Sequence, residues 1–220
     1  MRQILAFGDS NTWGLIPGTY PHKRYPWKVR WTSLLQEKYG DEEVRVIEEG
    51  LCGRTTVFED ALRPGRVGES SLQLVLESQT PLDAVILMLG TNDCKATYNV
   101  SAHTIGRGIE RCLDVVEEYV SPENILLVSP ISLGRDVWKP EKDPEFNRTS
   151  VETSIELKNV YKMIAKKHGV SFMAASDVVS ASEIDDEHMD AEGHRVFADT
   201  VYEKLAPILT SEKLAPILAS

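Results

Sequence analysis

The chain has 220 residues, 42% of them hydrophobic, and carries a formal net charge of −10 at pH 7. This length suffices for one domain with a large core, and an acidic chain without a stripe of Lys and Arg is not expected to bind nucleic acid. The three cysteines have no Cys-x-x-Cys spacing, which argues against a disulfide framework and a cysteine-based zinc site.

The apolar runs of the chain are short. None approaches the ~18 to 20 residues of a membrane span. The run at residues 4–7 is too short for the core of a signal peptide and is followed by no small-residue cleavage pattern. We therefore expect a cytoplasmic protein that does not insert into a membrane.

Short apolar runs alternate along the chain with segments of helical periodicity. The runs expected to form strands are RQILAF at 2–7, EVRVIEE at 43–49, LDAVILMLG at 82–90, NILLVSP at 124–130 and VSFMAA at 170–175. The segments expected to form helices are 29–40, 70–78, 105–120, 154–169 and about 191–205, and the segments 29–40 and 154–169 close at a glycine. This alternation predicts an α/β fold with a parallel sheet covered by helices on both faces.

The end of the chain contains a literal repeat, EKLAPILTS at 203–211 followed by EKLAPILAS at 212–220. Repeat architectures need units of about 20 residues or more. We therefore predict a single domain at residues 1–209 and a duplicated tail at 210–220. Because proline interrupts helices, the last helix is expected to end near Pro207.

Polar segments follow three of the expected strands at their carboxyl ends. They are Gly8–Ser10, Gly50–Thr56 and Gly90–Asp93. Ligands of open parallel sheets bind beyond this edge, so we expect the three segments to face one crevice. The long segments 15–27 and 132–150 are either walls of this site or ordinary surface loops.

Ser10 stands where the first strand ends, a position that exposes its hydroxyl at a strand-to-loop corner. A serine is a weak nucleophile unless a base lies within hydrogen-bonding reach and a third group orients that base. Of the five histidines, His188 follows Asp185 by three residues, so in a tight turn the carboxylate can reach Nδ1 and leave Nε2 for the serine. His194 falls in the last helix and is expected at the surface or partly packed. An Asp-x-x-His pattern alone is weak evidence, because an aspartate before a helix is usually a cap.

The turns after the second and third strands offer hydrogen-bond donors for an oxyanion. Gly53 has no Cβ, so its N–H can approach a substrate oxygen closely, while Asn92 offers its side-chain amide and Ser10 its own N–H. The alternative interpretations are a turn glycine and an asparagine that closes an Asx turn. Together, the four segments supply what an acyl-transfer site requires.

Four segments, in order, resemble the sequence blocks of the SGNH, or GDSL-type, hydrolases. They are FGDSNTWG, EEGLCGRTT, LGTND and DDEHMDAEGH, and they span residues 7–194. Within that family they are most similar to the bacterial arylesterase or acyltransferase branch. The resemblance implies a flavodoxin-like three-layer α/β/α sandwich around a five-stranded parallel sheet, with neither a metal nor an organic cofactor.

The resemblance also implies roles for individual residues. Ser10 would be the nucleophile, His188 the general base and then acid, and Asp185 its orienting partner. The oxyanion donors would be Ser10, Gly53 and Asn92. The residues that would hold the loops of the site are Asp9 and Asp93.

The chain departs from the family pattern at three places. Asn11 stands where the family name has Leu, which could change the packing of the loop. Cys52 stands where close relatives often have Ser, and is either a rival nucleophile or an inert buried thiol. Asp186 and Glu187 stand where relatives often have Gly and a hydrophobic residue, and either acid could perturb His188.

We predict a serine esterase that forms an acyl-enzyme from short-chain acyl or aryl esters and can pass the acyl group to water or to another acceptor. Trp13 and the 15–27 segment are expected to narrow the acyl pocket, with core packing as the alternative role of Trp13. Activity is expected to fall as His188 protonates, near pH 6.5 for an unperturbed imidazole.

Three further hypotheses stay open. The enzyme could be a carbohydrate or lipid ester deacylase of the same family. The chain could instead be a flavodoxin-like binding module whose turns hold a phosphate or a sugar without reaction. In a homo-oligomer, the 132–150 segment could enclose the site of a neighbouring chain.

Overall fold

A five-stranded parallel sheet forms the centre of the molecule. The computed structural model describes residues 1–210. The strands are β1 (Arg2–Gly8), β2 (Val44–Gly50), β3 (Ala84–Met88), β4 (Ile125–Ser129) and β5 (Ser171–Ala174). They lie in the order β2-β1-β3-β4-β5, and each pair of neighbours is parallel. All five predicted strands are confirmed.

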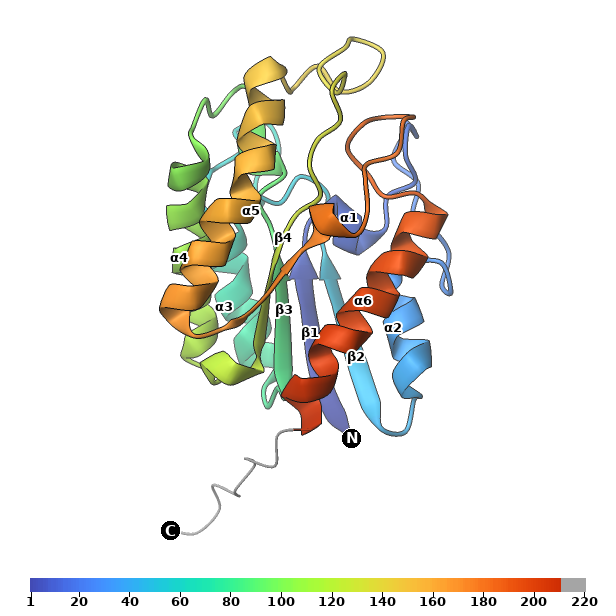
Figure 1. The fold of residues 1–220 in the computed structure, drawn as a ribbon, viewed down its shortest axis with the longest axis vertical. Coiled ribbons are helices and arrows are strands. Elements are labelled where there is room, and N and C mark those ends of the chain that lie inside the picture. Colours follow the sequence, from blue (N-terminus) through green and yellow to red (C-terminus); the bar gives the residue numbers. More distant parts are fainter. Residues whose placement is uncertain (211–220) are drawn as a thin grey trace.

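Helices cover both faces of the sheet. They are α1 (Ser10–Trp13), α2 (Trp31–Tyr39), α3 (Gly68–Gln79), α4 (Ala102–Glu117), α5 (Arg148–His168) and α6 (Ala191–Thr210). One layer consists of α3, α4 and α5, and the opposite layer contains α2 and α6 (Figure 1). The predicted three-layer α/β/α sandwich is therefore confirmed.

Each strand contributes side chains to two separate cores, because successive residues of a strand point to opposite faces. Leu5 and Phe7 of β1 pack on the side of α3, α4 and α5. Ile4 and Ala6 pack on the side of α2 and α6, where they meet Trp31. Burial on both faces explains why the central strands are continuous apolar runs instead of alternating ones.

The predicted end of the last helix is wrong. Helix α6 continues through Pro207 to Thr210. Ile208 and Leu209 are buried in the core on the α6 side, and the Leu209 carbonyl accepts a hydrogen bond from Arg2. A proline inside a helix costs about 3 kcal/mol, whereas burying two large aliphatic side chains contributes about 1.5 to 3 kcal/mol each.

The repeated tail begins inside this helix. Its second copy, at 212–220, lies outside the described residues. That residues 1–209 form one domain remains our proposal. Within residues 1–210, no helix is long and apolar enough to cross a membrane.

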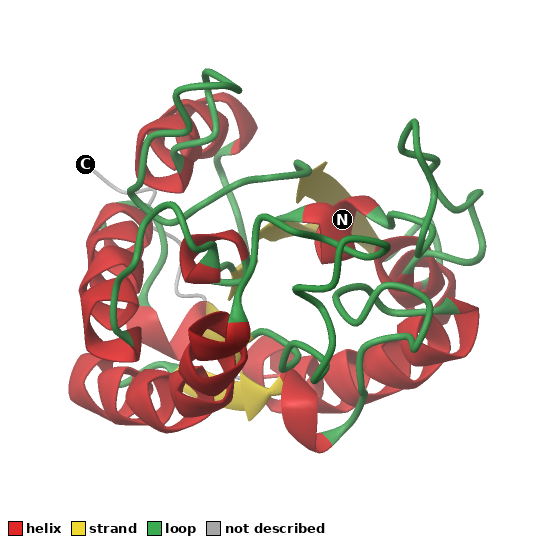
Figure 2. Cartoon of the chain, turned by 90° about the horizontal axis from the view of Figure 1, so that it is seen from above, coloured by secondary structure: helices red, strands yellow, loops and turns green. Residues whose placement is uncertain are grey.

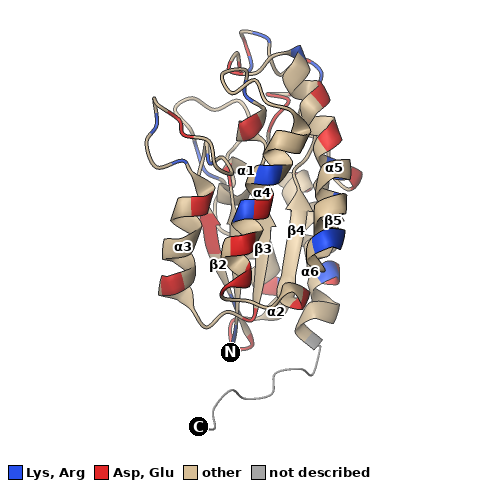
Figure 3. Cartoon of the chain, turned by 90° about the vertical axis from the view of Figure 1, so that its left-hand side faces the viewer, with Lys and Arg blue, Asp and Glu red and all other residues tan. Residues whose placement is uncertain are grey.

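Charged residues of both signs lie along α4 and α5, and acidic residues lie on α3 (Figure 3). Arg111 of α4 is bonded to Glu69 of α3. Lys167 of α5 lies 2.6 Å from Glu110 of α4. On this face the cations are therefore paired with carboxylates and do not form a basic stripe.

Loops gather beyond the carboxyl ends of the strands, as the view onto this end shows (Figure 2). The 132–150 loop is tied to the turn before α6, because Lys142 Nζ lies 2.7 Å from an Asp186 carboxylate oxygen. The 15–27 loop is tied to the same turn, since the Gly18 N–H donates to Asp185 Oδ2 at 3.0 Å. Both long loops therefore border the edge where polar segments were expected to meet.

Candidate active site

Ser10 opens the short helix α1 directly after β1. Asp9 caps this helix, with Oδ1 accepting from the Asn11 N–H at 3.0 Å. A Cβ at Gly8 would lie 2.2 Å from Thr12 Oγ1, so the tight corner excludes a side chain there. The Ser10 hydroxyl is consequently held at the end of the strand by backbone geometry.

Ser10, His188 and Asp185 form a continuous hydrogen-bonded chain. His188 Nε2 lies 2.9 Å from Ser10 Oγ, and His188 Nδ1 lies 2.8 Å from Asp185 Oδ2. The other oxygen of Asp185 accepts from the backbone N–H groups of Glu187 and His188 at 3.1 and 3.0 Å. The network assigns the Nδ1–H tautomer, which leaves the Nε2 lone pair facing the serine hydroxyl.

Asn11 joins the nucleophile corner to the turn that carries the histidine. Its Oδ1 accepts from the Met189 N–H at 2.9 Å, and its Nδ2 donates to the Glu187 carbonyl at 3.3 Å. These bonds link segments more than 170 residues apart, so Asn11 helps to set the distance between Ser10 and His188. The sequence singled out Asn11 only as a departure from the family pattern, and this bridging contact was missed.

The three expected oxyanion donors border the same cavity as Ser10 Oγ. Gly53 has a φ of +83°, which a residue with a Cβ rarely adopts. Asn92 Nδ2 donates one hydrogen to the Arg54 carbonyl at 3.1 Å, and its second hydrogen remains for a substrate. Within residues 1–210 the N–H groups of Ser10 and Gly53 have no acceptor.

Asp9 and Asp93 are buried beside these turns. Asp93 accepts from the Thr56 N–H at 3.0 Å and from the Thr56 hydroxyl, and so ties the turn after β3 to the loop after β2. Burial raises the pKa of Asp93 to about 6. Burial also raises the pKa of Asp9. The loop-holding roles implied for both residues agree with these contacts and stay predictions.

The cavity at Ser10 is small and mostly polar. It measures about 80 Å³. Its lining consists of Ser10, Leu15, His22, Cys52, Gly53, Arg63, Asn92, Lys95, Asp143, Glu145, Glu187 and His188. Both long loops contribute to the walls.

Trp13 does not belong to this lining. Its ring instead carries the guanidinium of Arg24, 5.4 Å from the ring centroid. The 15–27 segment, which was expected to narrow the acyl pocket together with Trp13, contributes Leu15 and His22 to the lining.

Two cationic side chains that line the cavity, Arg63 and Lys95, were not predicted from the sequence. The Arg63 guanidinium lies over Gly53, because a Cβ on Gly53 would be 3.0 Å from Arg63 Cζ. Asp60 holds it through Nε at 2.9 Å, and Lys95 is paired with Glu145. No motif marks Arg63, whereas Lys95 could have been noticed by its place three residues after Asn92.

Cys52 is present as a thiol at neutral pH. Burial raises its pKa to about 12, and the charges of Asp9 and Glu187 act in the same direction. A thiol is a poor nucleophile compared with a thiolate. The interpretation of Cys52 as a rival nucleophile is therefore disfavoured.

Two other histidines are accounted for by packing. His168 ends α5, and its Nδ1 lies 2.7 Å from Glu117 Oε1. The expectation for His194 is wrong, since it is 0% exposed and its Nδ1 accepts from the Trp31 N–H at 3.3 Å. Burial lowers the pKa of His194 to about 4. Helical spacing could not reveal that α2 covers this side chain.

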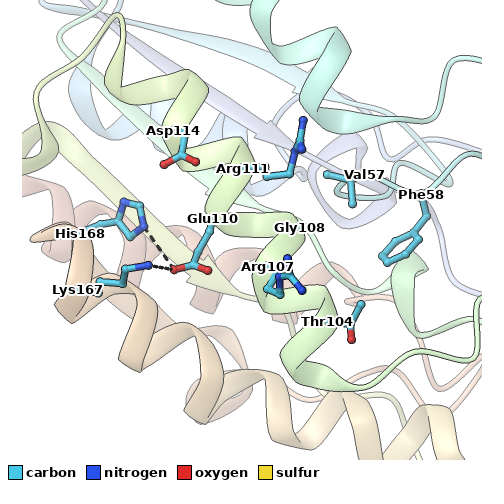
Figure 4. A pocket seen from close by; sticks show the side chains of 10 residues that line it. All are labelled: Val57, Phe58, Thr104, Arg107, Gly108, Glu110, Arg111, Asp114, Lys167 and His168. Carbon is cyan, nitrogen blue, oxygen red and sulfur yellow. Dashed lines mark hydrogen bonds and ion pairs between the residues drawn. The ribbon is translucent and has the colours of Figure 1, made fainter.

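A larger pocket of about 590 Å³ lies elsewhere, on α4 and the end of α5 (Figure 4). It shares no lining residue with the cavity at Ser10. Near it, Asp114, Glu117 and His168 offer ligand atoms within 4.8 Å of one another. His168 is already bonded to Glu117, and Glu110, the neighbouring acid, is paired with Lys167. This cluster is explained by ion pairs between the two helices.

Comparisons with known proteins found a matching family model and similar solved structures. Residues 6–196 match the sequence model of the GDSL-like lipase/acylhydrolase family. The chain is similar to Est24, a carbohydrate acetylesterase from Sinorhizobium meliloti, with 35% identity and a TM-score of 0.86 over 94% of this chain and 100% of that one. It is also similar to the native aryl esterase of M. smegmatis, with 32% identity and a TM-score of 0.86 over 95% of this chain and 100% of that one. No curated protein matches the sequence significantly.

Proposed function

This chain belongs to the GDSL-like lipase/acylhydrolase family and is a serine ester hydrolase, and from that premise we propose that Ser10, His188 and Asp185 carry out the reaction. The observation that carries the proposal is the hydrogen-bonded chain from Asp185 through His188 to Ser10. A binding module has no use for an imidazole that a carboxylate orients toward a serine hydroxyl at the edge of a cavity.

The reaction then proceeds in two halves. Ser10 Oγ attacks the ester carbonyl while His188 Nε2 takes its proton, and Asp185 stabilises the imidazolium that forms. The imidazolium returns the proton to the leaving alcohol, and an acyl-enzyme remains. Water, or another alcohol, gives its proton to His188 and attacks the acyl carbon. His188 then returns this proton to Ser10 Oγ as the acyl–oxygen bond breaks, which restores the free enzyme. Hydrolysis and acyl transfer thus share the site and differ only in the acceptor.

The oxyanion of the tetrahedral intermediate would be held by the N–H groups of Ser10 and Gly53 and by the amide of Asn92. Such donors act strongly because they are already oriented before charge develops. The Arg63 guanidinium lies over Gly53 beside this position, and Asp60 largely compensates its charge.

Replacing Asn92 with alanine is expected to lower kcat for p-nitrophenyl acetate by about 10²- to 10³-fold, because one oxyanion donor is lost. KM should change little, since this bond strengthens only as the carbonyl oxygen gains charge. Asn159→Ala, an exposed asparagine on α5, is the matched control and should keep full activity. A loss of less than about threefold in Asn92→Ala would remove Asn92 from the oxyanion site.

The cavity supports a short acyl group as the preferred substrate part. Pockets for drug-sized ligands measure about 300 to 1,000 Å³, whereas this cavity measures about 80 Å³. Leu15 is the single aliphatic side chain of its lining within the described residues. The other lining side chains are mostly polar and suit an acetyl ester of a polar alcohol. A carbohydrate ester is therefore the second candidate substrate. The similarity to a carbohydrate acetylesterase supports this candidate.

The test is a comparison of kcat/KM for p-nitrophenyl acetate and p-nitrophenyl decanoate. We expect a preference of about 10-fold or more for the acetate, because the long chain does not fit beside Ser10. An equal rate, or a preference for the decanoate, would contradict the short-acyl proposal. Release of acetate from an acetylated monosaccharide at a higher kcat/KM than from p-nitrophenyl acetate would favour the carbohydrate ester over the aryl ester.

A further inference from the structure

Glu187 places a second carboxylate beside the imidazole of His188. Glu187 Oε1 lies 3.7 Å from His188 Nε2, the nitrogen that also faces Ser10. The Glu187 residue is 6% exposed, and its side chain belongs to the lining of the cavity. The carboxylate of Asp185 acts on the opposite nitrogen, Nδ1, so the imidazole ring lies between two acids.

The local backbone holds Glu187 in this orientation. Its N–H donates to Asp185 Oδ1 at 3.1 Å, and its carbonyl accepts from Asn11 Nδ2 at 3.3 Å. With both backbone groups engaged, the side chain is directed into the cavity beside Ser10. The preceding acid, Asp186, points elsewhere: it accepts from the Asp136 N–H at 3.0 Å and pairs with Lys142.

We propose that Glu187 is a positioning residue that stabilises the imidazolium form of His188 through its carboxylate at Nε2, so that the enzyme becomes active only at higher pH. This inference rests on the proposed function, in which His188 is the base. A base must be neutral before the serine can be deprotonated. A carboxylate beside Nε2 stabilises the protonated form of His188. The neutral form, and with it the activity, therefore appears only at a higher pH.

Other charged groups also face this pair from the surrounding segments. They are Asp9 beside α1, His22 in the 15–27 loop, Arg63 after β2, Lys95 after β3, Asp143 and Glu145 in the 132–150 loop, and Asp185 in the same turn. Lys95 is paired with Glu145, and Arg63 is bonded to Asp60, so their charges are largely compensated. Among these acidic residues, Glu187 is the one whose carboxylate lies beside His188 Nε2.

The pKa shift of His188 has the sign that this geometry implies. Burial by itself lowers the pKa of His188, but the charge of Glu187, followed by the bond and charge of Asp185, raises that pKa to about 9. Burial raises the pKa of Glu187 to about 7, against the opposing effect of the His188 charge. Because the pKa of the base is raised, the active neutral form appears above the usual pH of a histidine, and removing Glu187 should move it back down.

The experiment compares wild type with Glu187→Gln, which keeps the side-chain size and removes the charge. Two readouts are followed from about pH 5 to about pH 10: the imidazole NMR signals of His188 and kcat/KM for p-nitrophenyl acetate. We expect the His188 midpoint and the acid limb of the activity profile to move together to lower pH by about one unit or more. Asp186→Asn removes one charge from the adjacent residue and should leave both curves unchanged.

An unchanged His188 midpoint in Glu187→Gln would overturn the proposal. The NMR titration does not depend on activity, so it decides the role of Glu187 even if no ester is hydrolysed. Absence of Ser10-dependent hydrolysis in wild type would be the separate failure of the proposed function. If Glu187→Gln does not fold, Glu187→Leu, which fills similar space without charge, is measured in the same way. A shift of equal size in Asp186→Asn would also contradict the proposal, because it would indicate a general effect of net charge.

Discussion

Replacement of Ser10 with alanine is expected to lower kcat/KM for p-nitrophenyl acetate by about 10⁴- to 10⁶-fold. The hydroxyl lies 2.9 Å from His188 Nε2, and without it no acyl-enzyme can form. The residual rate would come from the oxyanion donors and from binding alone. Thermal unfolding should change little, because the hydroxyl makes a single hydrogen bond at the edge of the cavity.

The matched control is Cys52→Ser, which removes the nearest thiol in the lining of the cavity. It should retain hydrolysis, since the raised pKa of Cys52 leaves a thiol that does not compete with Ser10. Quenching the wild-type reaction early and mapping the acetyl group by mass spectrometry should place it on the peptide that contains Ser10. Hydrolysis that survives in Ser10→Ala and disappears in Cys52→Ser would reverse the assignment. No ester hydrolysis in any variant would favour the binding module.

Replacement of Asp185 with asparagine is expected to lower kcat by about 10⁴-fold while the fold is preserved. In wild type the carboxylate accepts from His188 Nδ1 at 2.8 Å and so leaves the Nε2 lone pair for Ser10. An amide can instead donate to Nδ1, which moves the imidazole proton to Nε2 and removes the base. The imidazolium formed in the transition state would also lose its partner.

Kinetics, thermal unfolding and the imidazole NMR signals of Asp185→Asn together test this account. A large loss of kcat with an unchanged unfolding temperature would identify a catalytic effect. Asp185 also accepts from two backbone N–H groups and from the Gly18 N–H, and asparagine can satisfy some of these through its oxygen. Asp186→Asn is the control for charge. A loss below about 10-fold in Asp185→Asn would show that the orientation of His188 is set by other contacts.

Local features of the sequence determined the five strands, the five longer helices and the residues of the proposed triad, whereas the short helix α1 was not predicted. Apolar runs bounded by polar turns predicted the five strands, because a strand buried on both faces must be apolar throughout. The Asp185–His188 pair could be found because a contact across three residues in a turn depends on local backbone geometry. Ser10 could be found because the carboxyl edge of a parallel sheet is where ligands bind.

Contacts between distant segments were decided only by the tertiary structure. Pro207 suggested a helix end, yet burial of Ile208 and Leu209 continues the helix beyond it. His194 suggested a surface position, yet α2 covers it.

The same limit applies within the site. The sequence marked Glu187 as unusual, but its burial in the wall of the Ser10 cavity depends on how the turn before α6 docks against α1. The spacing of residues along the chain predicts helices, strands and contacts between residues that are close in sequence. The burial and charge that set the pKa of His188 arise only when segments from both ends of the chain are packed together.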